Sequence, residues 1–193
     1  MTDWTKNRAL KSVVLIGMPG SGKTHVGREA ARICQMDFTD MDELIEQRAG
    51  RTIPEIFETD GEEGFRKLET ELAAALAKKT DANVIIASEE KESESGWGKP
   101  TIYSTGGGVV TRPENEALLK QIGPVIFIHR DIAELASSVE YGADRPLLVE
   151  PGRVQILWEQ RRGAYRGWAD AMILNEGSVR VTAQRLAKLI KEM

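Results

Sequence analysis

The sequence has only one cysteine, Cys34, among 193 residues. A single cysteine excludes a disulfide bond within the chain, and this usage is typical of proteins in a reducing compartment. The sequence also lacks an excess of basic residues, because 26 Lys and Arg face 30 Asp and Glu and leave a net charge of −4. This charge has the wrong sign for a surface that binds nucleic acid. We therefore expect a cytoplasmic protein without a nucleic-acid partner.

Long apolar segments are also missing. No run of apolar residues approaches the length that crosses a membrane, and residues 1–11 lack the apolar stretch of a signal peptide. Hydrophobic residues make up 41 % and charged residues 29 %, which is typical of a globular domain in water. We expect one domain over residues 1–193, with a core from about residue 11, and no membrane partner.

A glycine-rich stretch organises the N-terminal part of the chain. Residues 17–24, Gly-Met-Pro-Gly-Ser-Gly-Lys-Thr, follow an apolar run (12–16) that predicts a strand and precede a segment (25–33) that predicts a helix. This is the context of a phosphate-binding P-loop. Glycines let backbone N–H groups line a concave nest, and the positive end of the helix points at the same place. Lys23 supplies a cation for the terminal phosphates, and the Thr24 hydroxyl can bind Mg²⁺.

Two carboxylates follow the next predicted strand, which ends near Phe38 or Thr39. Asp40 precedes Glu43 by three residues, so the pair can form a capping box at the start of a helix. Asp42 is not explained by capping. Two carboxylates at positions i and i+2 just beyond a strand can serve different ligands, one a metal ion and the other a substrate hydroxyl.

The central part of the chain leaves one strand undecided. Thr52 and Pro54 indicate a helix start, and residues 70–77 are rich in alanine and predict a helix. The spacing of Arg66 from two glutamates predicts an ordinary surface ion pair. Two apolar runs, 84–87 and 101–104, are both strand candidates, with a polar segment (88–100) between them that we expect to be an exposed loop.

Alternating helices and strands continue to the C-terminus. Three glycines at 106–108 permit a ligand to approach the backbone closely. Residues 111–113 cap a helix that extends to about Lys120, and Asp131 with Glu134 indicates another helix start after a strand at 125–128. Residues 141–148 predict a mobile loop, followed by a helix from Val154, a strand at 171–174 and a helix at 182–193. This order predicts an α/β fold with a parallel sheet that helices cover on both faces.

These motifs together resemble the shikimate kinase family over most of the chain. The matching segments are the P-loop at 17–24, Val-Gly-Arg at 26–28, Phe-x-Asp-x-Asp at 38–42, Ile-x-x-Ile-Phe at 53–57, Gly-Glu-x-x-Phe-Arg-x-x-Glu at 61–69, Gly-Gly-Gly-Val-Val at 106–110, Arg-Pro-Leu-Leu at 145–148, and Arg161, Tyr165, Ala169 and Asp170. The resemblance implies a nucleotide-kinase-like P-loop fold with a five-stranded parallel sheet and a mobile lid at about 141–152. It also implies an ATP:shikimate 3-phosphotransferase that uses ATP and Mg²⁺. Separately, we expect the protein to be a monomer.

The resemblance also implies roles for individual residues. The residues expected in catalysis are Lys23, Asp42 and Arg145. Those expected to bind the nucleotide are Gly20, Ser21, Gly22, Lys23, Thr24, His25 and Arg145. Shikimate is expected to contact Asp42, Arg66, Gly106, Gly107, Gly108 and Arg161. Mg²⁺ is expected at Thr24 directly and at Asp40 through water. Because arginine binds a carboxylate with two parallel hydrogen bonds, the resemblance replaces the surface interpretation of Arg66.

Three departures from the family pattern leave alternatives open. The segment 88–100 separates two candidate strands, of which we favour 102–104. Arg162 can replace Arg161 as the second carboxylate ligand, because the usual Pro-Leu is missing before Tyr165. Residues 137–144 contain no arginine that could stack on adenine.

Two other functions remain as alternatives. Another small-metabolite P-loop kinase, such as a gluconate kinase, would not need arginines at both 66 and 161. A nucleotide-binding regulator without catalytic activity would be expected to lack Lys23, Thr24 or Asp42, and all three are present.

Overall fold

The computed structural model describes residues 11–87, 99–138 and 152–193. The expected mobile lid with Arg145, and most of the expected exposed loop at 88–100, lie outside the described residues. Within the described part of the chain, no helix is both long and apolar enough to cross a membrane.

Five strands form one sheet in the order β2-β3-β1-β4-β5, and every pair is parallel. The strands are β1 (Val13–Ile16), β2 (Asp37–Asp40), β3 (Thr101–Ser104), β4 (Val125–His129) and β5 (Ala171–Leu174). All residues of β1 and β3 are buried, as expected for the central strands of a parallel sheet. The predicted five-stranded parallel sheet is confirmed.

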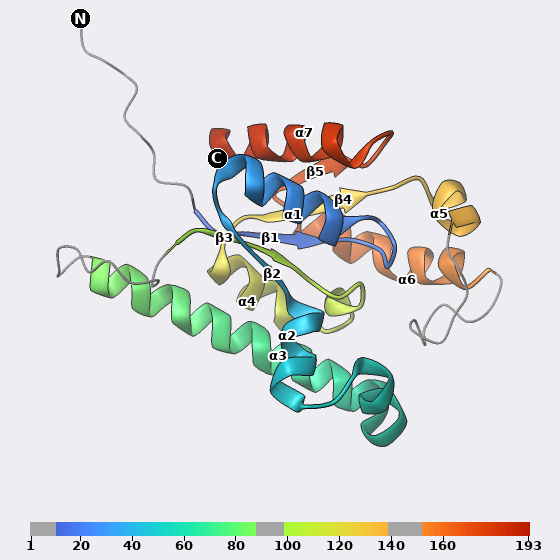
Figure 1. Cartoon of the computed structure of the whole chain (residues 1–193). Helices are drawn as coiled ribbons and strands as arrows, with labels where there is room; N and C mark the ends of the chain where they lie inside the picture. The colour runs from blue at the N-terminus through green and yellow to red at the C-terminus, as the bar shows by residue number, and fades with distance from the viewer. Residues whose placement is uncertain (1–10, 88–98, 139–151) are drawn as a thin grey trace, which may run out of the picture.

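Helices cover both faces of this sheet (Figure 1). Alternate residues of β1 point to opposite sides, so Val13 and Leu15 pack with helices α1 (Lys23–Cys34) and α7 (Val179–Glu192). Val14 and Ile16 pack on the other side, against a larger core. The helices that contribute to that core are α2 (Met41–Ala49), α3 (Ile53–Ala87), α4 (Glu114–Ile122), α5 (Ile132–Ser138) and α6 (Arg153–Trp168).

The structure decides between the two strand candidates of the central region. The apolar run at 101–104 is β3 and pairs with both β1 and β2, as we favoured. The alternative strand at 84–87 is wrong, because these residues continue α3, which ends at Ala87. The alanine-rich turns before them favour helix propagation, and 101–104 already occupies the sheet position. Within α3, Gly61 has a non-helical backbone with φ 71°, which separates a short first helix from the long second one.

Several predicted caps are present. Asp40 caps α2 by accepting a hydrogen bond from the Asp42 N–H at 3.0 Å. Asp131 accepts from the N–H groups of Ala133 and Glu134 at the start of α5. Two details differ from expectation. Glu43 does not complete a capping box but pairs with Arg28 at 3.2 Å. The 111–113 cap is also absent: a 3₁₀ turn at Val109–Thr111 precedes α4, which has no side-chain cap.

The packing of α7 generates a test of the fold. Leu186 of α7 is fully buried in the core that this helix forms with α1 and the sheet. Val181 on the same helix is 42 % exposed. Replacing Leu186 by Ala should lower the free energy of unfolding by about 2–5 kcal/mol through lost burial and a cavity. Val181→Ala serves as the matched control and should cost less than about 1 kcal/mol. Urea unfolding of both variants measures the difference, and equal costs would contradict this packing.

Candidate active site

Most of the predicted site residues that the structure describes gather where three neighbouring strands end. The P-loop follows β1, Asp40 is the last residue of β2, and Thr105 with the three glycines follows β3. Because these strands are parallel and adjacent, their carboxyl ends lie along one edge of the sheet. This edge is the usual ligand-binding position in open α/β folds.

The P-loop has a conformation that requires glycine at its junction with α1. Gly22 has φ 89°, and a Cβ atom there would lie 2.5 Å from the Asn175 side-chain nitrogen. That nitrogen donates to the Ser21 carbonyl at 2.8 Å, so the residue after β5 supports the loop. The first hydrogen bond inside α1 runs from the Val26 N–H to the Gly22 carbonyl. The N–H groups of Thr24 and His25 precede it, and such groups at a helix start are available to an anion.

Lys23 lies over its own loop. Its Nζ donates to the carbonyls of Gly17 and Met18, both at 2.9 Å, and the residue is only 6 % exposed. A cation in this position is held by neutral oxygen atoms that it can exchange for phosphate oxygens.

Thr24 and Asp40 form a possible metal-binding pair. The Thr24 hydroxyl donates to Asp40 Oδ2 at 2.8 Å and lies 3.4 Å from the Ser104 hydroxyl. Hydroxyl and carboxylate oxygens are hard ligands that fit Mg²⁺. The described residues contain no cluster of three or more His, Cys, Asp or Glu that could hold a metal alone. A cation at Thr24 and Asp40 would therefore complete its coordination with phosphate oxygens and water.

Asp42 is a buried hydrogen-bond acceptor. Its Oδ1 atom has no hydrogen-bond partner within the described residues and is shielded from solvent. Burial, and then the nearby carboxylates of Glu69 and Asp40, raise the pKa of Asp42 to about 7, although Lys23 and Arg66 act in the opposite direction. An unsatisfied acceptor of this kind is costly to bury and is suited to a ligand hydroxyl.

Arg66 is not a surface residue. It is 5 % exposed, so the interpretation from spacing alone is wrong. Its Nη1 donates to the carboxylate of Glu69, and its Nη2 donates to Glu62 at 3.0 Å. The guanidinium also lies against Gly108, where any Cβ atom would overlap with it. The third glycine therefore leaves the room that Arg66 needs.

Arg161 approaches the same glycines from α6. It is 5 % exposed, its Nη1 donates to the Gly107 carbonyl at 3.2 Å, and its Nε atom is buried without a partner among the described residues. Burial, and less strongly the charge of Arg66, lower the pKa of Arg161, whereas the nearby Tyr165 hydroxyl acts in the opposite direction. The alternative residue, Arg162, has a side chain that is 49 % exposed and pairs with Glu159 at 2.8 Å. The geometry thus brings Arg161, not Arg162, to the site.

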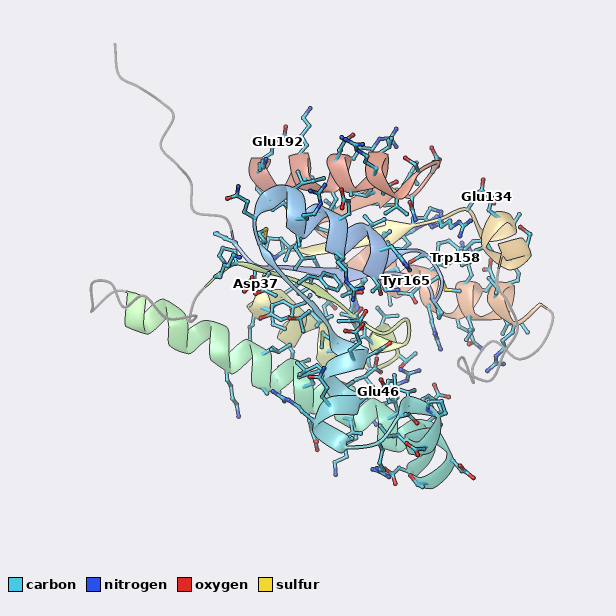
Figure 2. All side chains as sticks on the ribbon, in the orientation of Figure 1. Asp37, Glu46, Glu134, Trp158, Tyr165 and Glu192 are labelled. Atoms are coloured by element: carbon cyan, nitrogen blue, oxygen red, sulfur yellow. The ribbon has the colours of Figure 1, made fainter. Side chains whose placement is uncertain are left out.

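Sequence reasoning missed two residues of this site as functional candidates. Glu69 is 2 % exposed, and its Oε1 atom has no partner among the described residues. Burial raises the pKa of Glu69, an effect that the arginines Arg66 and Arg161 oppose. The signal was present, because Glu69 ends the motif at 61–69. The second residue is Tyr165 of α6 (labelled in Figure 2), which is fully buried and donates its hydroxyl to the Gly107 carbonyl.

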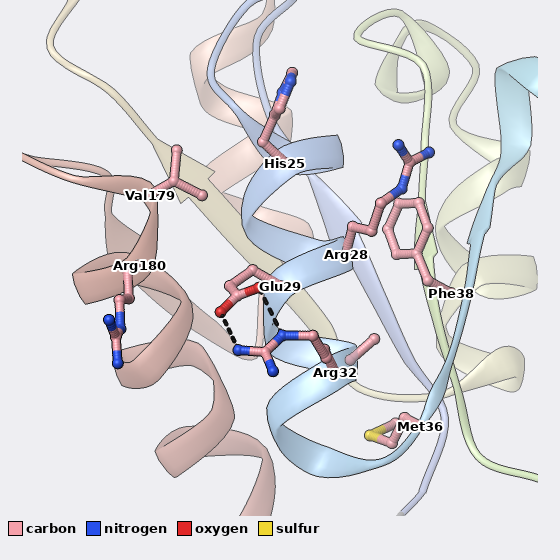
Figure 3. A pocket seen from close by; sticks show the side chains of 9 residues that line it. His25, Arg28, Glu29, Arg32, Met36, Phe38, Val179 and Arg180 are labelled. Carbon is pink, nitrogen blue, oxygen red and sulfur yellow. Dashed lines mark hydrogen bonds and ion pairs between the residues drawn. The ribbon is translucent and has the colours of Figure 1, made fainter.

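The His25 side chain lies apart from these residues. It is exposed and lines an open pocket on the outer side of α1, together with Arg28, Phe38 and Arg180 (Figure 3). Its expected role in nucleotide binding therefore rests on its backbone N–H in the first turn of α1.

These features together define a P-loop kinase that acts on a small molecule. Comparison with known proteins makes this class more specific. A family model described as shikimate kinase matches residues 19–90 and 93–191, and the chain belongs to this family. The resemblance stated from the motifs is confirmed.

Individual relatives agree with this assignment. The chain is 39 % identical over 181 residues to shikimate kinase from Synechococcus elongatus. The aligned region covers 91 % of this chain and 84 % of the relative. It is 40 % identical over 169 residues to shikimate kinase from Clostridium beijerinckii. Here the aligned region covers 86 % of this chain and 87 % of the relative. Among solved structures, shikimate kinase from Acinetobacter baumannii in complex with shikimate superimposes with a TM-score of 0.79 at 33 % identity, over 95 % of this chain and 94 % of the other.

The contact between Gly108 and Arg66 can be tested by its effect on stability. Gly108→Ala should lower the free energy of unfolding by about 1–3 kcal/mol, because the new methyl group overlaps with the guanidinium. In an Arg66→Met background the additional cost of Gly108→Ala should largely disappear. Thermal unfolding of the four proteins measures this coupling. Gly163→Ala, with open space around its Cβ position, is the control and should not destabilise. Independent, additive effects of the two substitutions would refute the contact.

Proposed function

We propose that this protein transfers the γ-phosphoryl group of ATP to the 3-hydroxyl of shikimate, giving shikimate 3-phosphate and ADP for aromatic amino acid biosynthesis. One observation carries the proposal: two buried guanidinium groups lie at the same sheet edge as the P-loop, together with an Asp42 oxygen that has no partner among the described residues. Shikimate offers the complementary groups, since it has one carboxylate and several ring hydroxyls.

In the proposed complex, Arg66 and Arg161 bind the carboxylate. Each guanidinium can present two parallel N–H groups to a carboxylate, a geometry that lysine cannot reproduce. The backbone at Gly106, Gly107 and Gly108 supplies close contact without side chains. Asp42 accepts a hydrogen bond from a ring hydroxyl and so directs that hydroxyl toward the phosphate.

The nucleotide is proposed to occupy the P-loop. The backbone of Gly20, Ser21 and Gly22, the N–H of His25 and the amine of Lys23 hold its phosphates. Thr24 directly and Asp40 through water would hold Mg²⁺, which would neutralise charge on the phosphates.

The chemistry needs little beyond positioning and charge stabilisation. Lys23 exchanges the carbonyls of Gly17 and Met18 for phosphate oxygens and stabilises negative charge during transfer. Asp42, with a pKa near neutrality, orients the attacking hydroxyl and can accept its proton at Oδ1. Arg145 remains a predicted lid residue that adds positive charge when the lid closes, and it lies outside the described residues.

The other functions have less support. A gluconate kinase has no need for both arginines, and here both are buried at the site. A regulator without catalysis has no need for the combination of Lys23, Thr24 and Asp42. We further propose a monomer in the cytoplasm, in keeping with the single cysteine and the net charge of −4. A coupled assay of ADP release with shikimate, quinate and gluconate tests the substrate, and turnover of gluconate in preference to shikimate would refute the proposal.

Loss of the P-loop cation should abolish most of the activity. Lys23→Met keeps the aliphatic part of the side chain and should fold, but kcat should fall by at least about 10²-fold because one preorganised electrostatic group is lost. The same assay measures kcat, and circular dichroism checks the fold. A variant that keeps a tenth of the wild-type kcat would show that Lys23 does not act on the transferred group.

Substrate choice should depend on the buried Arg66 of α3 and not on the exposed Arg162 of α6. Arg66→Ala should weaken shikimate binding by about 2–5 kcal/mol and leave ATP affinity nearly unchanged, since a buried charge pair loses one partner. Arg66→Lys should also bind shikimate poorly. Arg162→Ala is the control and should bind both ligands as the wild type does. Calorimetric titration of both ligands decides, and equal losses for ATP and shikimate would place Arg66 outside the substrate site.

A further inference from the structure

Tyr165 contacts the glycine segment, residues 106–108. The proposed function does not use this contact. Its side chain is fully buried, and its hydroxyl donates to the Gly107 carbonyl. Arg161 donates to the same carbonyl through Nη1 at 3.2 Å. The two residues are four apart on α6, so they lie on one face of the helix, one turn from each other. One carbonyl oxygen therefore receives both donors.

The ring of Tyr165 is held independently of its hydroxyl. It stacks on Phe127 of β4 with ring centroids 5.3 Å apart and an angle of 9° between the planes. Gly107 is confined on another side, because a Cβ atom there would lie 2.5 Å from Pro19 of the P-loop. The hydroxyl thus connects two rigid parts of the molecule, the α6–β4 packing and the glycine segment.

Arg161 depends on this carbonyl more than a surface arginine would. Its buried Nε has no partner among the described residues, and the positive charge of Arg66 is close enough to lower the pKa of Arg161. Repulsion between the two guanidinium groups favours any rotamer that separates them. A carbonyl fixed by a second donor opposes that movement.

We propose that Tyr165 is a positioning residue for substrate recognition: by fixing the Gly107 carbonyl it holds the Arg161 guanidinium where the substrate carboxylate binds. This inference rests on the proposed function, because it requires that Arg161 binds that carboxylate. Burial raises the pKa of the Tyr165 hydroxyl to about 12, so the group keeps its proton and remains a donor at neutral pH.

The test removes the hydroxyl and keeps the ring. Tyr165→Phe should weaken shikimate binding about tenfold, measured by calorimetry on the full chain, because one hydrogen bond that orients a charged group is lost. The dissociation constant of ATP and kcat at saturating shikimate should change less than twofold. Tyr103→Phe, which removes the hydroxyl of another buried tyrosine on β3, should change none of these values. Proportionate losses for ATP and shikimate in Tyr165→Phe would make the hydroxyl merely structural and overturn the inference.

A double-mutant cycle shows whether Tyr165 acts through Arg161. In an Arg161→Ala background, Tyr165→Phe should have no further effect on shikimate binding, and a full additional tenfold loss would overturn the inference. The methyl ester of shikimate is a second probe, and its binding should be nearly insensitive to Tyr165→Phe. Phe127→Leu keeps the hydroxyl and should lower stability without a selective loss of shikimate affinity. Should the wild-type protein fail to bind shikimate, the proposed function itself fails; wild-type binding with an unchanged Tyr165→Phe refutes only the inference about Tyr165.

Discussion

The arrangement around Gly106 and Gly108 depends on one buried contact, that between Arg66 and Glu69. The two residues are 5 % and 2 % exposed, so both charges have left water and each depends on the other. Breaking such a pair leaves an uncompensated buried charge, which costs about 3–5 kcal/mol. The glycines follow from this constraint, because side chains at Gly106 and Gly108 would displace the charged groups.

The strand order places this charge cluster close to the P-loop. β3 lies between β2 and β1, so the residues that follow β3 face the carboxylates of β2 on one side and the P-loop on the other. Asp40 joins the two halves directly: it accepts from the Thr24 hydroxyl with one oxygen and from the Asp42 N–H with the other. A cation that binds to Asp40 would therefore also act electrostatically on Asp42, two residues along the chain. The N-cap and the metal-ligand interpretations of Asp40 are compatible, since its two oxygen atoms serve different partners.

Local sequence patterns predicted the sheet, the P-loop and most helix starts, because each depends on residues that are close along the chain. The strand candidate at 84–87 failed because a long-range competition decides it: 101–104 fills the position between β1 and β2, and the helix simply continues. Arg66 shows the same limit. Its spacing from Glu62 and Glu69 fits a surface pair, and only tertiary packing buries it. The two hydrogen bonds that the Gly107 carbonyl accepts from Arg161 and Tyr165 could not be predicted, because these donors are 54 and 58 residues away along the chain.

The cationic side chains of the described site are bound to other groups of the protein, and this arrangement affects which ligands the site can select. Lys23 rests on two carbonyls, and Arg66 rests on two carboxylates. A ligand gains only the difference between its own contacts and those it displaces, so a weakly charged compound gains little from Arg66. A carboxylate gains more at Arg161, where the buried Nε has no partner among the described residues. In the proposed complex both arginines therefore separate acidic from neutral ligands, and the contribution of Arg161 depends on how firmly its guanidinium is held before the ligand arrives.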